Sequence, residues 1–510
     1  MKPAAAGLLA LVLFVAPAVP AAEDDERRSA ATLYDALCAE CHGADRLGGT
    51  GPALLPENLS RVSREDAQAA IAEGLPAAPM PGFGAVLDDA ELQALVEYIY
   101  TPLDDVPDWD LGDMAESRLA HLDEDATLAD EPQFSADPEN IFLVVETADH
   151  HVTVLDGDAF EPIHRFESRH ALYGEPKYSP DGRFAFLASR DGWISRFDLY
   201  NLQVTHEIRA GVNTRNLALS ADGRYLLVGN ELPHTLVVLD AVDLAPVQRI
   251  PVAATDGAAS SPVSAVYQAA PRCSFIAALR DVPEIWEVFP DPEAAPASAD
   301  AVAGAEGDGG FVVHRIRIED AMDNFFFDPG HHHLVGVVRD QGRSVVVDLE
   351  AGREVATVPI DGTPNLASAV TWEYEGRRVM ATPHLREATI SVVDLESWEV
   401  IRAIETRGPG FFLQTHEASP YVWADVFSGP HRDVVHLIDK ATLEIVETLR
   451  PEPGKTAAHV EFTRDGSHAL VSLWETDGAL MVFDADTLEE VKRLPMRRPS
   501  GKYNVSNRND

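Results

Sequence analysis

The sequence predicts a small all-α domain followed by an all-β eight-bladed β-propeller. The chain has 510 residues, which is longer than one domain usually spans. Apolar residues recur at helical spacing near the N-terminus, whereas the C-terminal part repeats a unit of short strands and turns. Hydrophobic residues make up 45% of the chain, which is enough to bury a core in each domain.

The first 22 residues have the features of a secretory signal peptide. Lys2 precedes an apolar run over residues 4–19, and small residues up to Ala22 lead into the acidic stretch 23–26. The run is short for a membrane span, and its flank is typical of a cleavage site. We therefore expect residues 1–22 to be removed and the mature protein to be periplasmic, with no membrane span. An uncleaved membrane anchor is the alternative.

The charge of the chain excludes one class of partner. Lys and Arg number 40 against 84 Asp and Glu, which gives a formal net charge of −44. Such a surface repels phosphate backbones and anionic lipid headgroups, so we expect no nucleic-acid binding. The three cysteines do not form a disulfide scaffold, and Cys273, which lies in an apolar stretch, is expected to be a buried small residue.

A haem-attachment motif lies shortly after the expected signal. Cys38, Cys41 and His42 form the pattern C-x-x-C-H, in which two thiols bond to the haem vinyl groups and the histidine ligates the iron. A disulfide or a zinc pair is the alternative. Met80, flanked by prolines and followed by an amphipathic helix over residues 87–99, is expected to be the second axial ligand. Residues 23–102 resemble a small class I cytochrome c with covalent haem c, which is suited to electron transfer.

The rest of the chain divides into an acidic linker and a repeat. Residues 103–138 contain prolines and little apolar periodicity, so we expect a linker with one short helix near residues 114–122. Over residues 139–510, strands end in a hydrophobic-Asp pair at intervals of 42, 42, 108, 46, 45 and 45 residues: Asp156, Asp198, Asp240, Asp348, Asp394, Asp439 and Asp484. The gap of 108 fits two units plus an insertion over residues 290–310, with the missing strand near residues 285–288. Eight such units indicate an eight-bladed propeller, closed by residues 142–145 or by the tail 503–505.

Four stretches of the propeller, taken as a set, resemble the cytochrome cd1 family: residues 171–183, 189–194, 211–216 and 499–505. In that family a haem c domain precedes an eight-bladed propeller that holds haem d1. The resemblance covers almost the whole mature chain, and it implies haem d1 or its dihydro precursor as the second tetrapyrrole. One branch of the family reduces nitrite to nitric oxide beside two distal histidines. Another branch, the dihydro-haem d1 dehydrogenase, oxidises a propionate side chain to an acrylate and passes electrons to its own haem c.

The resemblance favours the dehydrogenase branch. Arg280 and Asp323 stand where the reductase carries its two catalytic histidines, and neither residue type ordinarily titrates near neutral pH, as protonation of nitrite requires. Residues 457–466 and 494–497 are similar to the dehydrogenase, which implies His459 as the catalytic base or distal group. Arg190 and Arg215 would clamp the carboxylates of the substrate, or would instead pair with aspartates of the blades.

The resemblance leaves the iron ligand of the propeller open. The position at which the family usually carries a histidine is Tyr173, and His170 lies three residues earlier; either side chain can ligate haem iron. Asn365 stands where a distal histidine is expected. Three functions follow from the sequence. The first is a periplasmic dehydrogenase with a tetrapyrrole substrate and a periplasmic electron-transfer protein as partner. The second is a nitrite reductase with altered distal residues, and the third is a non-enzymatic haem carrier or electron-transfer protein.

Overall fold

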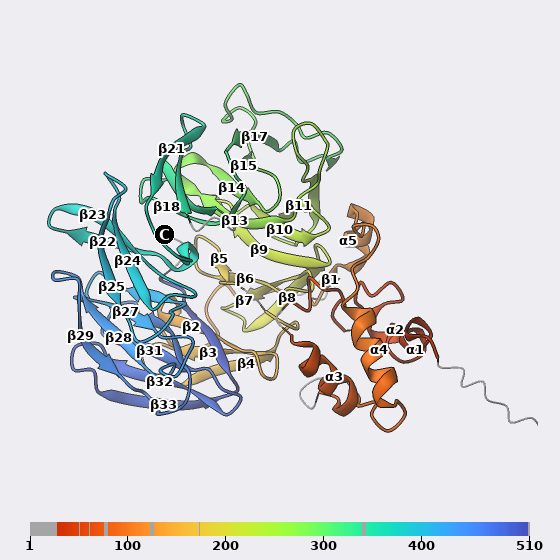
Figure 1. The fold of residues 1–510 in the computed structure, drawn as a ribbon, viewed down its shortest axis with the longest axis horizontal. Coiled ribbons are helices and arrows are strands. Elements are labelled where there is room, and N and C mark those ends of the chain that lie inside the picture. The colour runs from red at the N-terminus through yellow and green to blue at the C-terminus, as the bar shows by residue number, and fades with distance from the viewer. Residues whose placement is uncertain are drawn as a thin grey trace, which may run out of the picture.

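The computed structural model describes residues 28–49, 51–60, 62–75, 80–122, 127–172, 174–338 and 343–507. A small group of helices lies beside a ring of β-sheets (Figure 1). The expected signal peptide and Tyr173 lie outside the described residues. None of the helices in the described part of the chain has the length and apolar character needed to cross a bilayer.

The helical domain contains α1 (Ala30–Leu37), α2 (Ala39–His42), α3 (Arg64–Glu73) and α4 (Asp89–Ile99). α4 begins with a capping box, in which the Asp88 side chain accepts the Glu91 N–H and the Glu91 side chain accepts the Asp88 N–H. The apolar faces of α1, α3 and α4 meet in one core that includes Leu33, Tyr34 and Leu95. The predicted all-α domain is confirmed.

Eight antiparallel sheets make up the propeller within the described residues, and we number these blades in chain order. Each blade is given from its first strand outward. Blade 1 contains β34 (Pro499–Asn504), β2 (Ile141–Glu146), β3 (His151–Asp156) and β4 (Pro162–Glu167). Blade 2 contains β5 (Lys177–Tyr178), β6 (Phe184–Ala188), β7 (Trp193–Asp198), β8 (Gln203–Arg209) and β1 (Leu119–Ala120). Blade 3 contains β9 (Asn213–Leu219), β10 (Tyr225–Leu232), β11 (Thr235–Asp240), β12 (Pro246–Pro251) and β16 (Glu306–Gly307). Blade 4 contains β13 (Val263–Ala269), β14 (Ser274–Leu279), β15 (Glu284–Phe289) and β17 (Val312–Arg317).

The other four blades follow the same plan. Blade 5 contains β18 (Met322–Phe327), β19 (His333–Val338), β20 (Arg343–Asp348) and β21 (Arg353–Val358). Blade 6 contains β22 (Val370–Tyr374), β23 (Arg377–Pro383), β24 (Thr389–Asp394) and β25 (Val400–Glu405). Blade 7 contains β26 (Leu413–Thr415), β27 (Tyr421–Asp425), β28 (Val435–Asp439) and β29 (Glu444–Leu449). Blade 8 contains β30 (Ala457–Phe462), β31 (His468–Leu473), β32 (Gly478–Asp484) and β33 (Glu490–Met496). Short 3-10 helices are η1 (Pro138–Asn140), η2 (Ala270–Arg272) and η3 (Leu366–Ser368).

The first strand of each blade faces the hub of the ring. β5, β9 and β13 contact one another in order around the hub, as do β26, β30 and β34. The two ends of the propeller close the ring together, because the C-terminal strand β34 pairs antiparallel with β2 and sets Tyr503 opposite Leu143. The sequence predicts either segment as the closing strand, and the structure pairs them with each other. The predicted eight-bladed propeller is confirmed.

The repeated aspartates end the third strand of their blades and hold the turn that follows. In blade 6 the Asp394 carboxylate accepts the N–H groups of Glu396 (2.8 Å) and Ser397 (3.0 Å). The fourth residue after the aspartate then takes a left-handed conformation, as at Trp398 (φ 60°), and its N–H returns to the Asp394 carbonyl. Turns of this kind are commonly closed by a side-chain oxygen that accepts the N–H groups two and three residues later in the chain. An aspartate carboxylate can do this, which explains why aspartate recurs at this position.

Two features of blade 4 and its surroundings differ from a simple repeat. The missing strand predicted near residues 285–288 is β15, and the insertion after it supplies β16, which pairs with β12 of blade 3. Cys273 is exposed, so the expectation of a buried residue is wrong. It lies in the turn between η2 and β14 with φ 52°, and the burial of the apolar stretch begins only at Ser274.

The segment between the domains is partly folded against the propeller. α5 (Leu111–Ser117) buries Met114 among residues of blades 2 and 3, and β1 extends blade 2 by pairing with β8. The helix expected near residues 114–122 lies earlier in the chain, because Asp110 caps its N-terminus by accepting the Asp113 N–H at 2.9 Å.

The helical domain packs against blades 2 and 3 (Figure 1). Ala53 and Leu55 of the helical domain form a buried apolar cluster with Val212 and Leu232 of the propeller. Beside this cluster, the Asn58 side-chain amide donates to the Val212 carbonyl at 3.0 Å.

Candidate functional site

One face of the propeller carries most of the predicted site residues. In an antiparallel blade, the start of the first strand and the turn between the second and third strands lie at the same end. Arg215 and His459 are each the third residue of a first strand, β9 and β30. Arg190 lies in the turn between β6 and β7. We call this end of the ring the site face.

Three arginines line a cavity of about 270 Å³ on the site face. Arg190, Arg215 and Arg280 come from blades 2, 3 and 4, and they are joined in the lining by Glu231 and Asp323. The Arg215 Nε donates to the Ser264 carbonyl at 2.7 Å, and the Arg280 guanidinium pairs with Glu231 at 2.6 Å.

The charge of this cavity suits an anionic ligand. Three guanidinium groups face two carboxylates, and guanidinium groups hold carboxylates by paired hydrogen bonds. The structure therefore brings Arg190 and Arg215 together, as their proposed role requires. It also places Arg280 and Asp323, which stand in place of histidines, in the same cavity.

His459 lies across the hub from this cavity, in a strained position. It forms a bulge between Ala458 and Val460 in the pairing of β30 with β31, and its φ is 52°. Its ring makes edge contacts with Phe412 (4.7 Å between centroids) and Tyr503 (5.2 Å). Bulges and left-handed non-glycine residues occur at functional sites because they re-aim a side chain at a cost in backbone energy.

The His459 imidazole is neutral at neutral pH. Its side chain is buried, and among the described residues its Nδ1 has no hydrogen-bond partner. Burial, together with the nearby positive charge of Lys502, holds the pKa of His459 well below its ordinary value. An unprotonated imidazole with a free nitrogen is able to accept a proton from a ligand.

Three further buried ionisable groups surround His459, and we call the four residues the His459 cluster: Asp425, His459, Glu461 and Lys502. Burial raises the pKa of Asp425 to about 6 and that of Glu461 to about 7, and it lowers the pKa of Lys502 to about 7. The Lys502 charge attracts both carboxyls, and its Nζ donates to the Ser472 hydroxyl at 3.0 Å.

Asp425 organises the backbone around His459. Its carboxylate accepts the N–H groups of Phe411 (2.8 Å), Phe412 (3.1 Å) and His459 (3.3 Å). The Asp425 side chain thereby holds two segments: the bulge that carries His459, and the loop that carries Phe412, whose ring packs on the His459 ring. Asn365, predicted as a distal-position residue, supports the same loop, because its amide donates to the Phe411 carbonyl at 2.8 Å.

Asp425, Glu461 and Lys502 were not among the residues predicted from the sequence. Lys502 lies within the stretch 499–505 that carries the family resemblance, which is the signal that could have found it. Asp425 and Glu461 stand in apolar strands of blades 7 and 8, and only the ring closure brings them beside Lys502 of blade 1. The cluster comes from blades 7, 8 and 1, and the arginine cavity from blades 2 to 5, so the two face each other across the hub.

His170 lies between the two domains. It is half-buried in the segment that joins β4 to β5, and its ring meets His150 edge-on at 4.5 Å. It lies close enough to His42 of the helical domain and to Asp191 beside Arg190 to lower the pKa of each group. Tyr173, the other residue named as an iron ligand, lies outside the described residues.

The haem-attachment motif has the geometry that its chemistry needs. Cys38 ends α1 and Cys41 lies in α2, both as free thiols. The His42 Nδ1 donates to the Pro52 carbonyl at 2.8 Å, which leaves Nε2 as the nitrogen free to ligate iron. A Cβ on Gly51 would lie 2.8 Å from the His42 Cε1, so this loop fits under the ring only with glycine.

The residues present therefore fit a covalent haem. Met80 belongs to the apolar core that also contains Cys38 and Leu54, which is consistent with an axial ligand on that side. Within the described ranges, no group of three or more His, Cys, Asp or Glu is placed to hold a metal ion. This result includes the triplet His331, His332 and His333, which lies at the start of β19.

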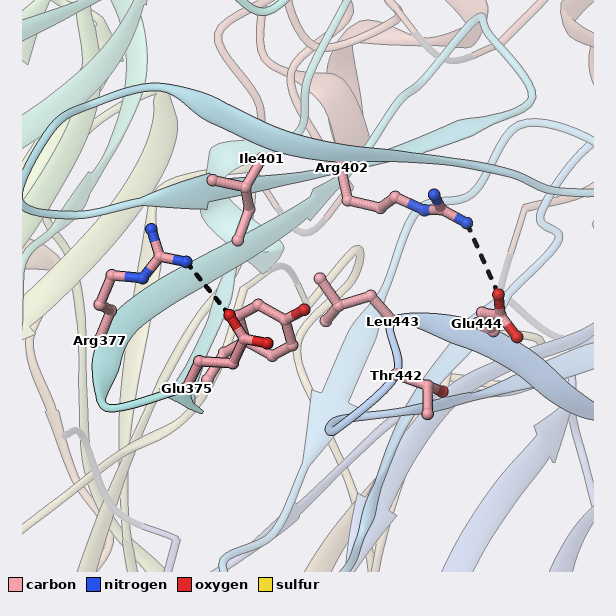
Figure 2. Close-up of a pocket in the computed structure, with 8 residues that line it drawn as sticks. Glu375, Arg377, Ile401, Arg402, Thr442, Leu443 and Glu444 are labelled. Carbon is pink, nitrogen blue, oxygen red and sulfur yellow. Dashed lines mark ion pairs between the residues drawn. The ribbon is translucent and has the colours of Figure 1, made fainter.

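A second hollow, of about 250 Å³, lies between blades 6 and 7 (Figure 2). Two ion pairs line it, Arg377 with Glu375 (3.6 Å) and Arg402 with Glu444 (3.9 Å). Glu375 and Thr442 lie in turns at the end of the blades opposite to the site face. Its charges are already paired with each other, and it is separate from the His459 cluster.

Together, a helical domain whose residues fit a covalent haem and a propeller with an arginine-lined cavity define a c-type cytochrome fused to a β-propeller. Comparison with known families supports this class in both parts of the chain. A family described as "Cytochrome D1 heme domain" matches residues 136–508, and one described as "Cytochrome C oxidase, cbb3-type, subunit III" matches residues 25–99. The chain belongs to the cytochrome d1 haem domain family, and the predicted resemblance to the cytochrome cd1 group is confirmed.

Individual relatives cover nearly the whole chain. The "Dihydro-heme d1 dehydrogenase" of Pseudomonas aeruginosa is 52% identical over 476 residues, which are 93% of this chain and 93% of that protein. A solved structure, "Dihydro-heme d1 dehydrogenase NirN in complex with DHE", superposes with a TM-score of 0.87 over 93% of this chain and 98% of that one. "Protein NirF" of Pseudomonas aeruginosa is 28% identical and covers 71% of this chain and 90% of its own length.

Proposed function

We propose that this protein oxidises a propionate side chain of dihydro-haem d1 to an acrylate and passes the electrons to its own haem c. The observation that carries the proposal is the 52% identity, over 93% of both chains, to a protein named for this activity. The solved structure of that name was determined in a complex, and its fold matches this chain with a TM-score of 0.87.

The reaction balances as a two-electron dehydrogenation. The propionate –CH2–CH2–COO⁻ loses one hydrogen from each of two carbons, and a C=C bond forms between them. Two protons and two electrons leave the substrate. The protein must hold the carboxylates, accept at least one proton beside the reacting carbons, and provide an electron acceptor.

The residues of the site supply these parts. Arg190 and Arg215, with Arg280 beside them, hold substrate carboxylates in the cationic cavity. His459 accepts a proton at Nδ1, the buried nitrogen that has no partner among the described residues. Glu461 lies two residues along the same strand with a pKa of about 7, so it can take up a proton in the same pH range.

The helical domain provides the electron acceptor. Cys38 and Cys41 would hold the haem covalently, and His42 and Met80 would ligate its iron. Haem c, when bound, accepts electrons one at a time. We assign residues 23–102 to this domain, 103–138 to the linker and 139–510 to the propeller.

Export to the periplasm is part of the same proposal. Residues 1–22 have the pattern of a signal peptide, and covalent haem attachment is typical of exported proteins of this kind. A periplasmic electron-transfer protein would be the partner that takes the electrons onward from haem c. The iron of the bound tetrapyrrole also needs a ligand from the propeller. We assign this ligand to the loop that contains His170 and Tyr173.

Two other functions have less support. The nitrite-reducing branch of the family uses two distal histidines, and the cavity carries Arg280 and Asp323 at the positions that the resemblance assigns to them. A haem carrier would need the cationic cavity but not the strained, buried His459, whose backbone geometry costs free energy.

The test is mass spectrometry of the pigment extracted after anaerobic incubation of the oxidised holoprotein with dihydro-haem d1. We expect the pigment to lose two hydrogens, and we expect His459→Ala to bind the pigment without converting it. A matched control is His384→Ala, a buried histidine of blade 6 that hydrogen-bonds Ser391 at 2.9 Å. Pigment that is bound and recovered unchanged by the wild type would show a carrier, and nitrite turnover would show a reductase.

A further inference from the structure

Arg209 connects three parts of the molecule at the boundary between the domains. It is the last residue of β8 in blade 2, and 5% of its surface is exposed. Its guanidinium donates to the Leu47 carbonyl of the helical domain and, at 3.0 Å, to the Asp191 carbonyl of the propeller. Its guanidinium also lies over the Trp109 ring of the segment between the domains, 4.9 Å from the centroid.

The backbone of Arg209 strengthens the same junction. The Trp109 indole donates to the Arg209 carbonyl at 2.9 Å, and the Arg209 N–H donates to the Ser117 hydroxyl at 3.0 Å. Around these bonds lies the apolar cluster of Ala53, Leu55, Val212 and Leu232, which excludes water. Charged hydrogen bonds in a buried setting are strong and directional, so they fix geometry as well as adding stability.

On the helical side, this junction leads directly to the haem-binding loop. Gly48, the residue after Leu47, donates its N–H to the His42 carbonyl at 2.8 Å. The loop lies so close that a Cβ on Gly48 would come within 2.8 Å of the Arg209 Nη2. Two hydrogen bonds therefore link Arg209 to His42, the expected haem ligand: one from the Arg209 side chain to the Leu47 carbonyl and one from the Gly48 N–H to the His42 carbonyl.

On the propeller side, the junction leads to the substrate cavity. Asp191, whose carbonyl accepts the Arg209 Nε, directly follows Arg190, which lines the arginine cavity. The Asp191 carboxylate is buried and accepts the Ser189 hydroxyl, so the whole turn from Ser189 to Asp191 is held in one conformation.

We propose that Arg209 is a positioning residue that holds the haem c loop at a constant distance from the Arg190 turn, so that electrons leaving the substrate reach haem c efficiently. This rests on the proposed function. Arg209 does not line the cavity. Electron transfer falls steeply with distance, so loosening this junction slows reduction of haem c without changing how tightly the cavity binds its ligand.

The test compares Arg209→Lys and Arg209→Gln with a matched control, Arg249→Gln. Arg249 of β12 also ties the segment between the domains to the propeller, through Asp108, and it pairs with Glu306 within blade 3. Among the described residues, no ion pair joins Arg249 to the helical domain. Lysine keeps the charge at position 209 but cannot reach both carbonyls with the geometry of a guanidinium. A thermal melt of each holoprotein establishes that the variant is folded.

Two measurements are made on each holoprotein. Hydrogen exchange of the amides in residues 46–55, without substrate, reports the junction itself. The first-order reduction of haem c after mixing with saturating dihydro-haem d1 reports electron transfer, and an absorbance titration gives the Kd. For Arg209→Gln we expect faster hydrogen exchange of the amides in residues 46–55 than in the wild type. We expect reduction of haem c to be slower by roughly 10- to 100-fold, and the Kd for dihydro-haem d1 to change by less than about twofold. We expect Arg209→Lys to lie between this variant and the wild type, and Arg249→Gln to match the wild type.

The outcomes separate this proposal from the proposed function. Exchange and reduction rates in Arg209→Gln equal to those of the wild type would overturn the role of Arg209. A loss of binding and rate in equal measure would also overturn it, because that result indicates a general structural role. If wild-type haem c is not reduced by the substrate, the proposed function fails, whereas the exchange measurement still decides whether Arg209 holds the junction.

Discussion

At the scale of single residues, the function depends on buried charges whose partners come from other blades. His459 was predicted from the sequence because its surroundings resemble a known family. Its pKa, however, is lowered first by burial and then by the charge of Lys502, and its backbone is held by Asp425; neither residue lies near it in the chain. Burial moves the pKa values of Asp425, Glu461 and Lys502 toward neutrality, which suits proton transfer at neutral pH, whereas it lowers the pKa of His459 further below its ordinary value.

Asp425→Asn tests whether this carboxylate positions His459. The amide keeps the shape of the side chain but turns one acceptor into a donor, so at least one of the three backbone N–H bonds is lost. We expect a loss of about 1–3 kcal/mol in the free energy of unfolding, and substrate oxidation slower by roughly 10- to 100-fold because the bulge relaxes. Chemical denaturation and single-turnover kinetics measure the two effects.

Asp394→Asn is the matched control for this variant. Asp394 is also buried and also accepts two backbone N–H groups, but it lies in the outer turn of blade 6. It should lower stability by a similar amount and leave the single-turnover rate unchanged. Equal rates in the two variants would show that Asp425 contributes stability alone.

At the scale of elements, the blades were predictable because their signals are local. An aspartate that closes its own turn can be recognised within five residues, and seven of these aspartates set the register of the repeat. The pairing of β16 with blade 3 was not predictable, because a strand of two residues forms only where a neighbouring edge is present. The exposure of Cys273 was not predictable either. It depends on where the turn lies and not on the apolar residues that follow it in the sequence.

The closing strand β34 gives a prediction of its own, because it carries Lys502 into the cluster. The charge of Lys502 lowers the pKa of His459, so removing that charge should raise the pKa of His459. In Lys502→Met, His459 then becomes protonated at a higher pH than in the wild type. We expect the acid limb of the single-turnover rate profile to move toward higher pH, with little change on its alkaline side.

The measurement is the rate of pigment oxidation from pH 5 to pH 9 in the wild type, Lys502→Met and a control, Lys492→Met. Lys492 lies on β33 at the periphery and donates to the Ala159 carbonyl at 3.0 Å. A shift of the acid limb toward lower pH in Lys502→Met, or no shift, would contradict the charge effect that we assign to Lys502.

At the scale of the whole molecule, the proposed function makes the two domains one electron-transfer unit. The arginine cavity and the His459 cluster face each other across the hub, and the haem-binding loop is joined to the cavity side through Arg209. The sequence could predict both domains, because each has its own motif. It could not predict how they dock, because that depends on contacts between residues more than a hundred positions apart, such as Asn58 and Val212.

The most direct test of the central claim is an anaerobic titration of the oxidised holoprotein with dihydro-haem d1, following haem c reduction and pigment mass together. We predict that each pigment molecule converted to the acrylate form delivers two electrons, so that two haem c groups are reduced for every substrate consumed. Pigment conversion without reduction of haem c, or haem c reduction with the pigment mass unchanged, would contradict the account.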